Sequence, residues 1–111
     1  PRDTPQPPEH LSTESQAWWH RLTQDYDFAS GELRLLQSAC EAWDRQQQAR
    51  AALDEHGTTY TDRFDQPRAR PEVGIERDCR LAFARLLREM NLDAAGEPGR
   101  PPRINNRYAR T

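Results

Sequence analysis

The sequence predicts a mainly α-helical protein, in which a short first helix packs against an antiparallel pair of longer helices joined by a β-hairpin-like loop. Apolar residues recur at steps of three and four in three stretches, residues 12–27, 30–56 and 71–92. Residues that favour helix starts and stops flank these stretches, and prolines are confined to their starts and to the segments outside them. The chain is therefore expected to comprise a proline-rich lead-in (1–11), a helical oligomerisation domain (12–92) and a flexible basic tail (93–111).

The first helix is expected to begin at Ser12, whose hydroxyl is suited to capping the N–H groups of the first turn. Its apolar stripe consists of Trp19, Leu22 and Tyr26, with Trp18 beside them. Adjacent tryptophans are costly to expose to water, so they are expected to pack in the core or in an interface. Stacking on nucleic-acid bases is the alternative.

The second helix is expected to be capped by Ser30 and to stop at Gly57. Two apolar stripes run along it, one of Leu33, Leu36, Cys40 and Trp43 and one of Leu35, Ala39, Ala42, Ala49 and Leu53. So wide an apolar surface is typical of a helix held between neighbours in a bundle or a ring. Only 34% of the residues are hydrophobic. This low share favours a core that is completed by oligomerisation.

The segment between the long helices combines strand propensity with turn residues. Residues 58–61 favour a strand, and residues 62–66 and 67–70 follow as a turn and a weaker second arm. The pattern predicts a short hairpin or an extended loop. Asp62 and Asp65 near Arg63 are interpreted as turn residues that bond to local backbone groups, with a metal site as the alternative.

The third helix is expected to have two opposed faces. Pro71 suits the first helical position and Glu72 the positive end of the helix dipole. The apolar face comprises Ile75, Cys79, Ala82, Phe83, Leu86 and Met90, and the far side carries Arg77, Arg80, Arg85 and Arg88. These arginines are expected to pair with acids such as Glu41 and Asp44 of a neighbouring subunit. Contact with nucleic-acid phosphates is the alternative.

Charge and cysteine content limit the partners and the compartment. All 16 basic residues are arginine, whose planar fork suits carboxylate or phosphate. The net charge is −2, but residues 98–111 contain four arginines and no acid. Such a basic tail is common in nucleic-acid-binding arms and in solvated tails alike. Cys40 and Cys79 are expected to be buried free thiols, which fits a reducing cytoplasm.

The sequence offers no arrangement of residues suited to catalysis. Its three histidines share no metal-ligand spacing with one another or with the cysteines, and there is no glycine-rich phosphate loop or nucleophile elbow. An enzyme is therefore not expected, and neither is a metal or a cofactor. No apolar run approaches the length of a membrane span, and no signal peptide is visible.

The order of these segments resembles the small terminase subunit family of tailed bacteriophages. The matching stretches are Pro7–Ser12 before a tryptophan-containing helix, Leu35–Leu36 and Ala39–Asp44, the Gly57 stop, the Asp62–Pro71 loop, and Ile75–Asp78 leading to Leu86–Leu92. The likeness covers about residues 7–103 and rests on the ordered set of stretches. Within the loop, Asp65 stands where glycine is expected, and Arg70 where histidine or asparagine is expected.

This resemblance implies a viral genome-packaging factor that acts in the host cytoplasm. Such subunits form rings, engage double-stranded viral DNA and pass it to a large terminase subunit, which carries the ATPase and nuclease. They are not enzymes themselves. We therefore expect a ring assembled through the second and third helices. A dimeric helix-turn-helix regulator and an assembly adaptor without DNA contact are the alternatives.

The candidate site residues follow from these interpretations. For DNA we expect the tail (Arg100, Arg103, Arg107 and Arg110), then the third-helix row (Arg77, Arg80, Arg85 and Arg88) and the loop (Arg63, Arg68 and Arg70). For the oligomer interface we expect Leu33, Leu36, Trp43, Leu53, Phe83 and Leu87.

Overall fold

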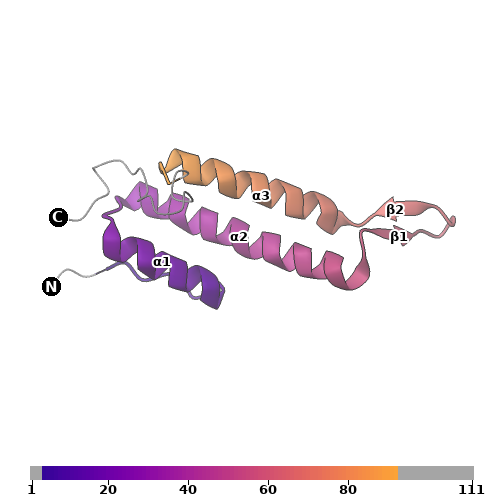
Figure 1. The fold of residues 1–111 in the computed structure, drawn as a ribbon, viewed down its shortest axis with the longest axis horizontal. Coiled ribbons are helices and arrows are strands. Elements are labelled where there is room, and N and C mark those ends of the chain that lie inside the picture. The colour runs from indigo at the N-terminus through magenta and orange to yellow at the C-terminus, as the bar shows by residue number, and fades with distance from the viewer. Residues whose placement is uncertain (1–3, 93–111) are drawn as a thin grey trace, which may run out of the picture.

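The computed structural model describes residues 4–92, which form three helices and one small antiparallel sheet (Figure 1). In chain order the elements are α1 (Thr13–Asp25), α2 (Ser30–His56), β1 (Thr59–Thr61), β2 (Pro67–Ala69) and α3 (Pro71–Glu89). Helices α1 and α3 both lie against α2, and the two strands extend beyond the far end of the α2–α3 pair (Figure 1). The prediction of a mainly helical fold with a hairpin between the two longer helices is confirmed.

Helix α1 begins as predicted, but the core extends further toward the N-terminus than expected. The Ser12 hydroxyl accepts the N–H of Ser15 at 3.1 Å and so caps the helix. Before the cap, Leu11 is only 4% exposed, and the Trp19 indole N–H donates to the Pro5 carbonyl at 2.9 Å. The lead-in therefore packs against α1 and contributes Leu11 to the core.

Helix α2 has the predicted length but a different cap. The N-cap residue is Ala29, whose backbone N–H donates to the Glu32 carboxylate at 2.7 Å. Ser30 is therefore the first residue of the helix, and its expected capping role was wrong, because Glu32 supplies the acceptor for the helix start. At the other end, Gly57 adopts a φ of +80° and donates to the Leu53 carbonyl, as the predicted stop requires.

The segment between the long helices is a hairpin in which Tyr60 pairs with Arg68. One oxygen of Asp62 accepts the N–H groups of Phe64 at 2.8 Å and Gln66 at 3.0 Å, so this aspartate is a turn residue. Asp65 has a φ of +61°, in the left-handed region that favours glycine. The backbone conformation at Asp65 is therefore one that glycine adopts easily, which agrees with the glycine expected here from the family resemblance.

Helix α3 ends one turn earlier than predicted, at residue 89 instead of 92. Asn91 has a φ of +59°, the N–H of Asn91 donates to Arg88, and that of Leu92 donates to the Leu87 carbonyl at 2.7 Å. This is a Schellman ending, in which the residue after the reversal packs back onto the protein. Leu92 is accordingly only 4% exposed.

The core lies where α1, the first half of α2 and the end of α3 meet. Its buried members are Leu11, Trp19, Leu36, Ala39, Cys40, Met90 and Leu92. No residue of α3 from Pro71 to Glu89 is fully buried. On the predicted apolar face of α3, Ala82 and Ile75 are exposed and Cys79 is only partly buried. The predicted apolar face of α3 was thus too wide, because α2 covers only a narrower strip of this helix around Phe83.

Candidate functional site

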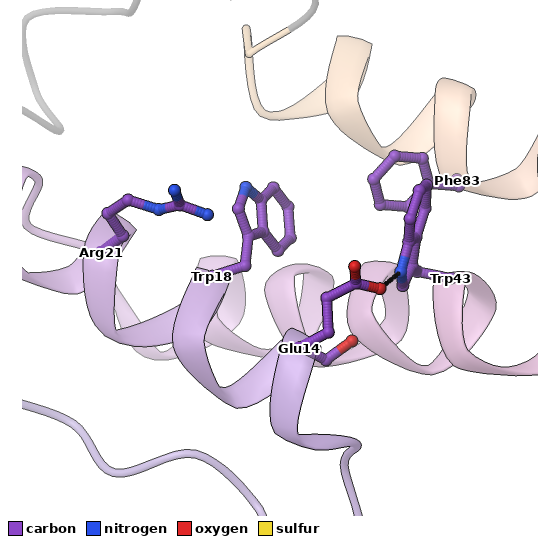
Figure 2. A pocket seen from close by; sticks show the side chains of 6 residues that line it. Glu14, Trp18, Arg21, Trp43 and Phe83 are labelled. Atoms are coloured by element: carbon purple, nitrogen blue, oxygen red, sulfur yellow. Dashed lines mark hydrogen bonds between the residues drawn. The ribbon is translucent and has the colours of Figure 1, made fainter. Parts of the chain in front are cut away.

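A cleft of about 190 Å³ opens between the three helices (Figure 2). Three aromatic rings line it, Trp18 from α1, Trp43 from α2 and Phe83 from α3. The Phe83 ring centroid lies 5.8 Å from that of Trp18 and 5.3 Å from that of Trp43, with both pairs tilted by about 50°. Because the tilted rings pack against one another and remain partly exposed, the cleft has apolar walls that are open to a partner.

Two opposite charges flank the aromatic walls. The Glu14 carboxylate lies at the mouth and accepts the Trp43 indole N–H (Figure 2). Arg21 lies on the side of Trp18 away from the other two rings (Figure 2). Both charged side chains belong to exposed residues of α1. A ligand group in the cleft would therefore meet apolar walls, an acid between Trp18 and Trp43, and a base on the far side of Trp18 (Figure 2).

Asp44 of α2 positions the α1 wall of the cleft. Its carboxylate accepts the Ser12 N–H at 2.8 Å, the Ser12 hydroxyl at 2.6 Å and the Ser15 hydroxyl at 2.6 Å. Partial burial alone would raise the pKa of Asp44, but these hydrogen bonds and the nearby His10 lower it overall. The expected pairing of Asp44 with an arginine of a neighbour therefore competes with bonds that it already makes within the chain.

A second, polar hollow is lined largely by α2 residues and includes His10, Glu41 and Asp44. Glu41 accepts a hydrogen bond from Gln37 at 3.2 Å and lies 2.6 Å from the His10 ring nitrogen. The two acids expected to receive a neighbour's arginines thus already have partners in this chain.

The four arginines of α3 separate into two pairs. Arg77 lies 3.3 Å from Asp78, in an exposed ion pair of small energetic value. Arg80 lies 3.4 Å from Glu76, whose side chain is largely buried. Arg85 and Arg88 have no ion-pair partner within residues 4–92. They line a shallow depression on the outer side of α3, together with Asp78, Leu81, Ala82, Ala84 and Leu86.

The three hairpin arginines differ in how free they are. Arg63 is exposed, and its guanidinium lies 4.9 Å from the centroid of the Phe64 ring. Arg68 donates to Asp62 at 2.9 Å, and the pKa of that carboxyl is lowered first by the backbone N–H of Gln66 and then by Arg68. Arg70 is the N-cap residue of α3, and its Nε is buried without a hydrogen-bond partner in the described part of the chain. Arg63 is therefore the hairpin arginine best placed for an outside anion.

The predicted site residues thus occupy separate regions of the molecule. Arg100, Arg103, Arg107 and Arg110 lie outside the described residues. Of the expected interface residues, Leu36 is fully buried inside the protomer, and Leu33 and Leu87 are partly buried against the same core. Leu53 is partly buried farther along α2, whereas Trp43 and Phe83 line the cleft.

Sequence reasoning missed Glu14 and Arg21 as members of a site. The signal was present in their spacing, since both lie on the same side of α1 as Trp18, four residues before it and three after it. It also missed the role of Asp44 as an acceptor for the start of α1. That contact joins residues about thirty positions apart, so no local pattern in the sequence indicates it.

A family model described as phage terminase, small subunit, matches residues 16–98, which is three quarters of the chain. The chain belongs to this family. The match covers α1 from Gln16 onward, all of α2 and α3, and the hairpin of this small terminase subunit, and it includes the cleft residues Trp18, Arg21, Trp43 and Phe83. Neither the search of curated proteins nor the search of solved structures returned a match.

Two further findings concern residues 4–92 alone. Within that range no cluster of three or more histidine, cysteine, aspartate or glutamate side chains is arranged to hold a metal ion. None of the three helices is long and apolar enough to cross a membrane.

Proposed function

We propose that this small terminase subunit forms a ring that binds double-stranded viral DNA and recruits and regulates the large terminase subunit during genome packaging in the host cytoplasm. The family match over residues 16–98 is the observation that carries the proposal. In this role the chain is a non-catalytic subunit, and the ATPase and nuclease reside in the large subunit.

The surface of the described residues is consistent with a DNA-binding role at the hairpin. Both strands are exposed along their whole length, and Phe64 at the turn is 67% exposed. Arg63 extends the same exposed turn and can reach a phosphate without breaking an ion pair. We assign the first DNA contacts to Arg63 and to the arginines of residues 98–111, with Arg68 and Arg70 as supporting positions.

The arrangement of α1 and α2 does not favour the alternative of a helix-turn-helix regulator. Ser15 near the start of α1 bonds to Cys40 and Asp44, well inside α2, whereas only four residues separate the end of α1 from the start of α2. The two helices therefore run antiparallel along each other, and α2 is covered by α1 and α3 (Figure 1). A recognition helix instead crosses its partner at a steep angle and leaves a face free for the groove.

DNA binding is tested by fluorescence anisotropy with a labelled duplex over a series of salt concentrations. Each phosphate that the protein no longer neutralises should decrease the magnitude of the slope of log K against log salt by about 0.9. Arg63→Ala is expected to expose about one phosphate, and truncation after Gly96, which removes four arginines, up to about four. Arg50→Ala, at an exposed position of α2 outside the proposed surface, is the matched control. An unchanged slope in both test variants would refute this DNA assignment.

The partner assignment has a separate readout. The purified large subunit is expected to co-elute with the wild-type small subunit, and its ATPase rate is expected to change on mixing. Native mass spectrometry of the wild-type small subunit should show a closed set of many copies. Full assembly without DNA affinity at any moderate salt would instead identify an assembly adaptor.

A further inference from the structure

We infer that the aromatic cleft receives Leu81 from α3 of a second copy of this chain. In this contact Arg85 of the second copy reaches Glu14, and its Asp78 reaches Arg21. The inference rests on the proposed ring and assigns the residues that would join its neighbouring subunits. The receiving surface is called the cleft face, and the row Asp78, Leu81 and Arg85 is called the outer row of α3.

The cleft face presents an acid, an apolar centre and a base in that order along α1. Glu14, Trp18 and Arg21 are four and three residues apart, so they share one side of the helix. One oxygen of Glu14 is bonded to Trp43, and the other has no hydrogen-bond partner within residues 4–92. Glu14 is therefore able to receive an arginine without losing its bond to the cleft wall.

The outer row of α3 presents the complementary sequence of groups. Asp78, Leu81 and Arg85 are three and four residues apart and line the same depression. The Leu81 side chain is 58% exposed, and the side chain of Asp78 is 73% exposed. Asp78 has one exposed ion pair, with Arg77, which is cheap to exchange for another partner. Both rows run from acid to apolar residue to base in chain order, so opposite charges face each other when the two helices run antiparallel.

The two rows match in register when the second copy's α3 runs antiparallel to α1. The spacing from Glu14 to Trp18 to Arg21 is four then three, and the spacing from Arg85 to Leu81 to Asp78 is also four then three. At ~1.5 Å per residue, the two charges on each row lie about 10.5 Å apart along their helix. Both ion pairs can therefore form at once while Leu81 faces the aromatic rings.

The geometry also explains why the outer row of α3 cannot contact the cleft face of its own chain. Leu81 and Phe83 are two residues apart on α3, which places them about 200° apart around the helix. Phe83 faces the cleft and Leu81 faces away from it, so the two interacting surfaces lie on opposite sides of the same helix. A contact between two different surfaces is heterologous, and repeating it produces a closed ring or an open filament.

The polar hollow on α2 is a weaker candidate for the arginine. Its acids Glu41 and Asp44 already accept hydrogen bonds within the chain. It also contains a cation of its own, Arg45, and none of the residues that line it is a phenylalanine, tyrosine or tryptophan that could contact a leucine. The cleft face offers both an available carboxylate oxygen and an apolar wall, which is what the outer row requires.

A charge exchange tests the register. Arg21→Glu and Asp78→Arg, made separately, are each expected to raise the concentration at half assembly at least about tenfold, because each brings like charges together. The double variant Arg21→Glu/Asp78→Arg restores an opposite pair and should assemble within about threefold of wild type. Arg50→Glu is the control for a charge change outside the contact. Assembly is measured by light scattering after gel filtration over a range of concentrations, with circular dichroism to confirm that each variant is folded.

Mixing two defective proteins tests whether the contact is heterologous. Leu81→Asp removes the apolar group but leaves the cleft face intact, and Glu14→Arg/Arg21→Glu reverses the cleft charges but leaves the outer row intact. Each alone is expected to be monomeric. Mixed one to one, they retain a single working contact, so they should form heterodimers and nothing larger.

The outcomes separate this inference from the proposed function. If wild type assembles and both Leu81→Asp and Arg21→Glu assemble as well as wild type does, the inference is wrong and the ring forms through another interface. If these variants assemble but no longer bind the large subunit, the cleft serves that partner, which also overturns the inference. A wild-type protein that stays monomeric at all concentrations would refute the ring itself.

Discussion

Replacing Asp44 with alanine should destabilise the protomer by about 2–3 kcal/mol. The carboxylate accepts three hydrogen bonds, two from Ser12 and one from Ser15. Ser12 is exposed, so water can replace its two bonds, and each is worth about 0.5 kcal/mol. Ser15 is only 2% exposed, and its hydroxyl would keep only a long 3.4 Å contact to the Cys40 carbonyl, which adds about 1–2 kcal/mol.

Urea unfolding followed by circular dichroism measures this loss. Several protein concentrations are needed, because dissociation of an assembly shifts the midpoint with concentration and unfolding of a protomer does not. Asp54→Ala, at an exposed position of the same helix, corrects for the higher helix propensity of alanine. A free energy of unfolding for Asp44→Ala within about 0.5 kcal/mol of that control would refute the argument that this carboxylate fixes α1 to α2.

Three further predictions follow from the same structure. Burial, with help from Asp44, raises the pKa of Cys40 to about 12. A disulfide exchange reagent at pH 8 should therefore label the partly exposed Cys79 at least about tenfold faster than Cys40, and equal labelling rates would contradict this. Asp65→Gly should stabilise the protein by up to about 1 kcal/mol, because its φ of +61° is strained for a residue with a side chain; a lower urea midpoint would show that the side chain compensates. Because the pKa of Asp44 is lowered in the folded protein, ionised Asp44 stabilises the protein fully above the ordinary carboxyl pKa of about 3.9, and this stabilisation is lost as pH falls through the folded-state pKa. Asp44→Asn should therefore flatten the acid limb of a curve of stability against pH.

Local patterns were sufficient for most of the secondary structure. Ser12, Gly57 and Pro71 each act at a helix end through their own backbone or side-chain chemistry, and each was assigned correctly from the sequence. The errors arose where a neighbour changed the local outcome. Glu32 replaced the expected cap at Ser30 by supplying its own carboxylate to the backbone.

The site was less accessible to sequence reasoning because it depends on contacts between distant segments. Trp18 and Phe83 were each expected to be packed, but nothing in either helix indicates that their rings meet. The width of the apolar face of α3 was also overestimated. Periodicity predicts which residues share a side of a helix, but only the position of α2 decides that Ala82 is exposed while Phe83 is partly buried.

The uneven distribution of the core suggests that assembly and DNA binding use opposite ends of the molecule. The buried cluster and the cleft lie at the end where α1 is present, and beyond it the α2–α3 contact includes a polar bond, Gln46 to Glu76 at 2.9 Å. The hairpin with Arg63 projects from that second end (Figure 1). A charge at the hairpin is therefore far from the surfaces assigned to assembly. Because substitutions at distant sites act nearly independently, Arg63→Ala should weaken DNA binding without altering assembly, and Leu81→Asp should abolish assembly without unfolding the protomer.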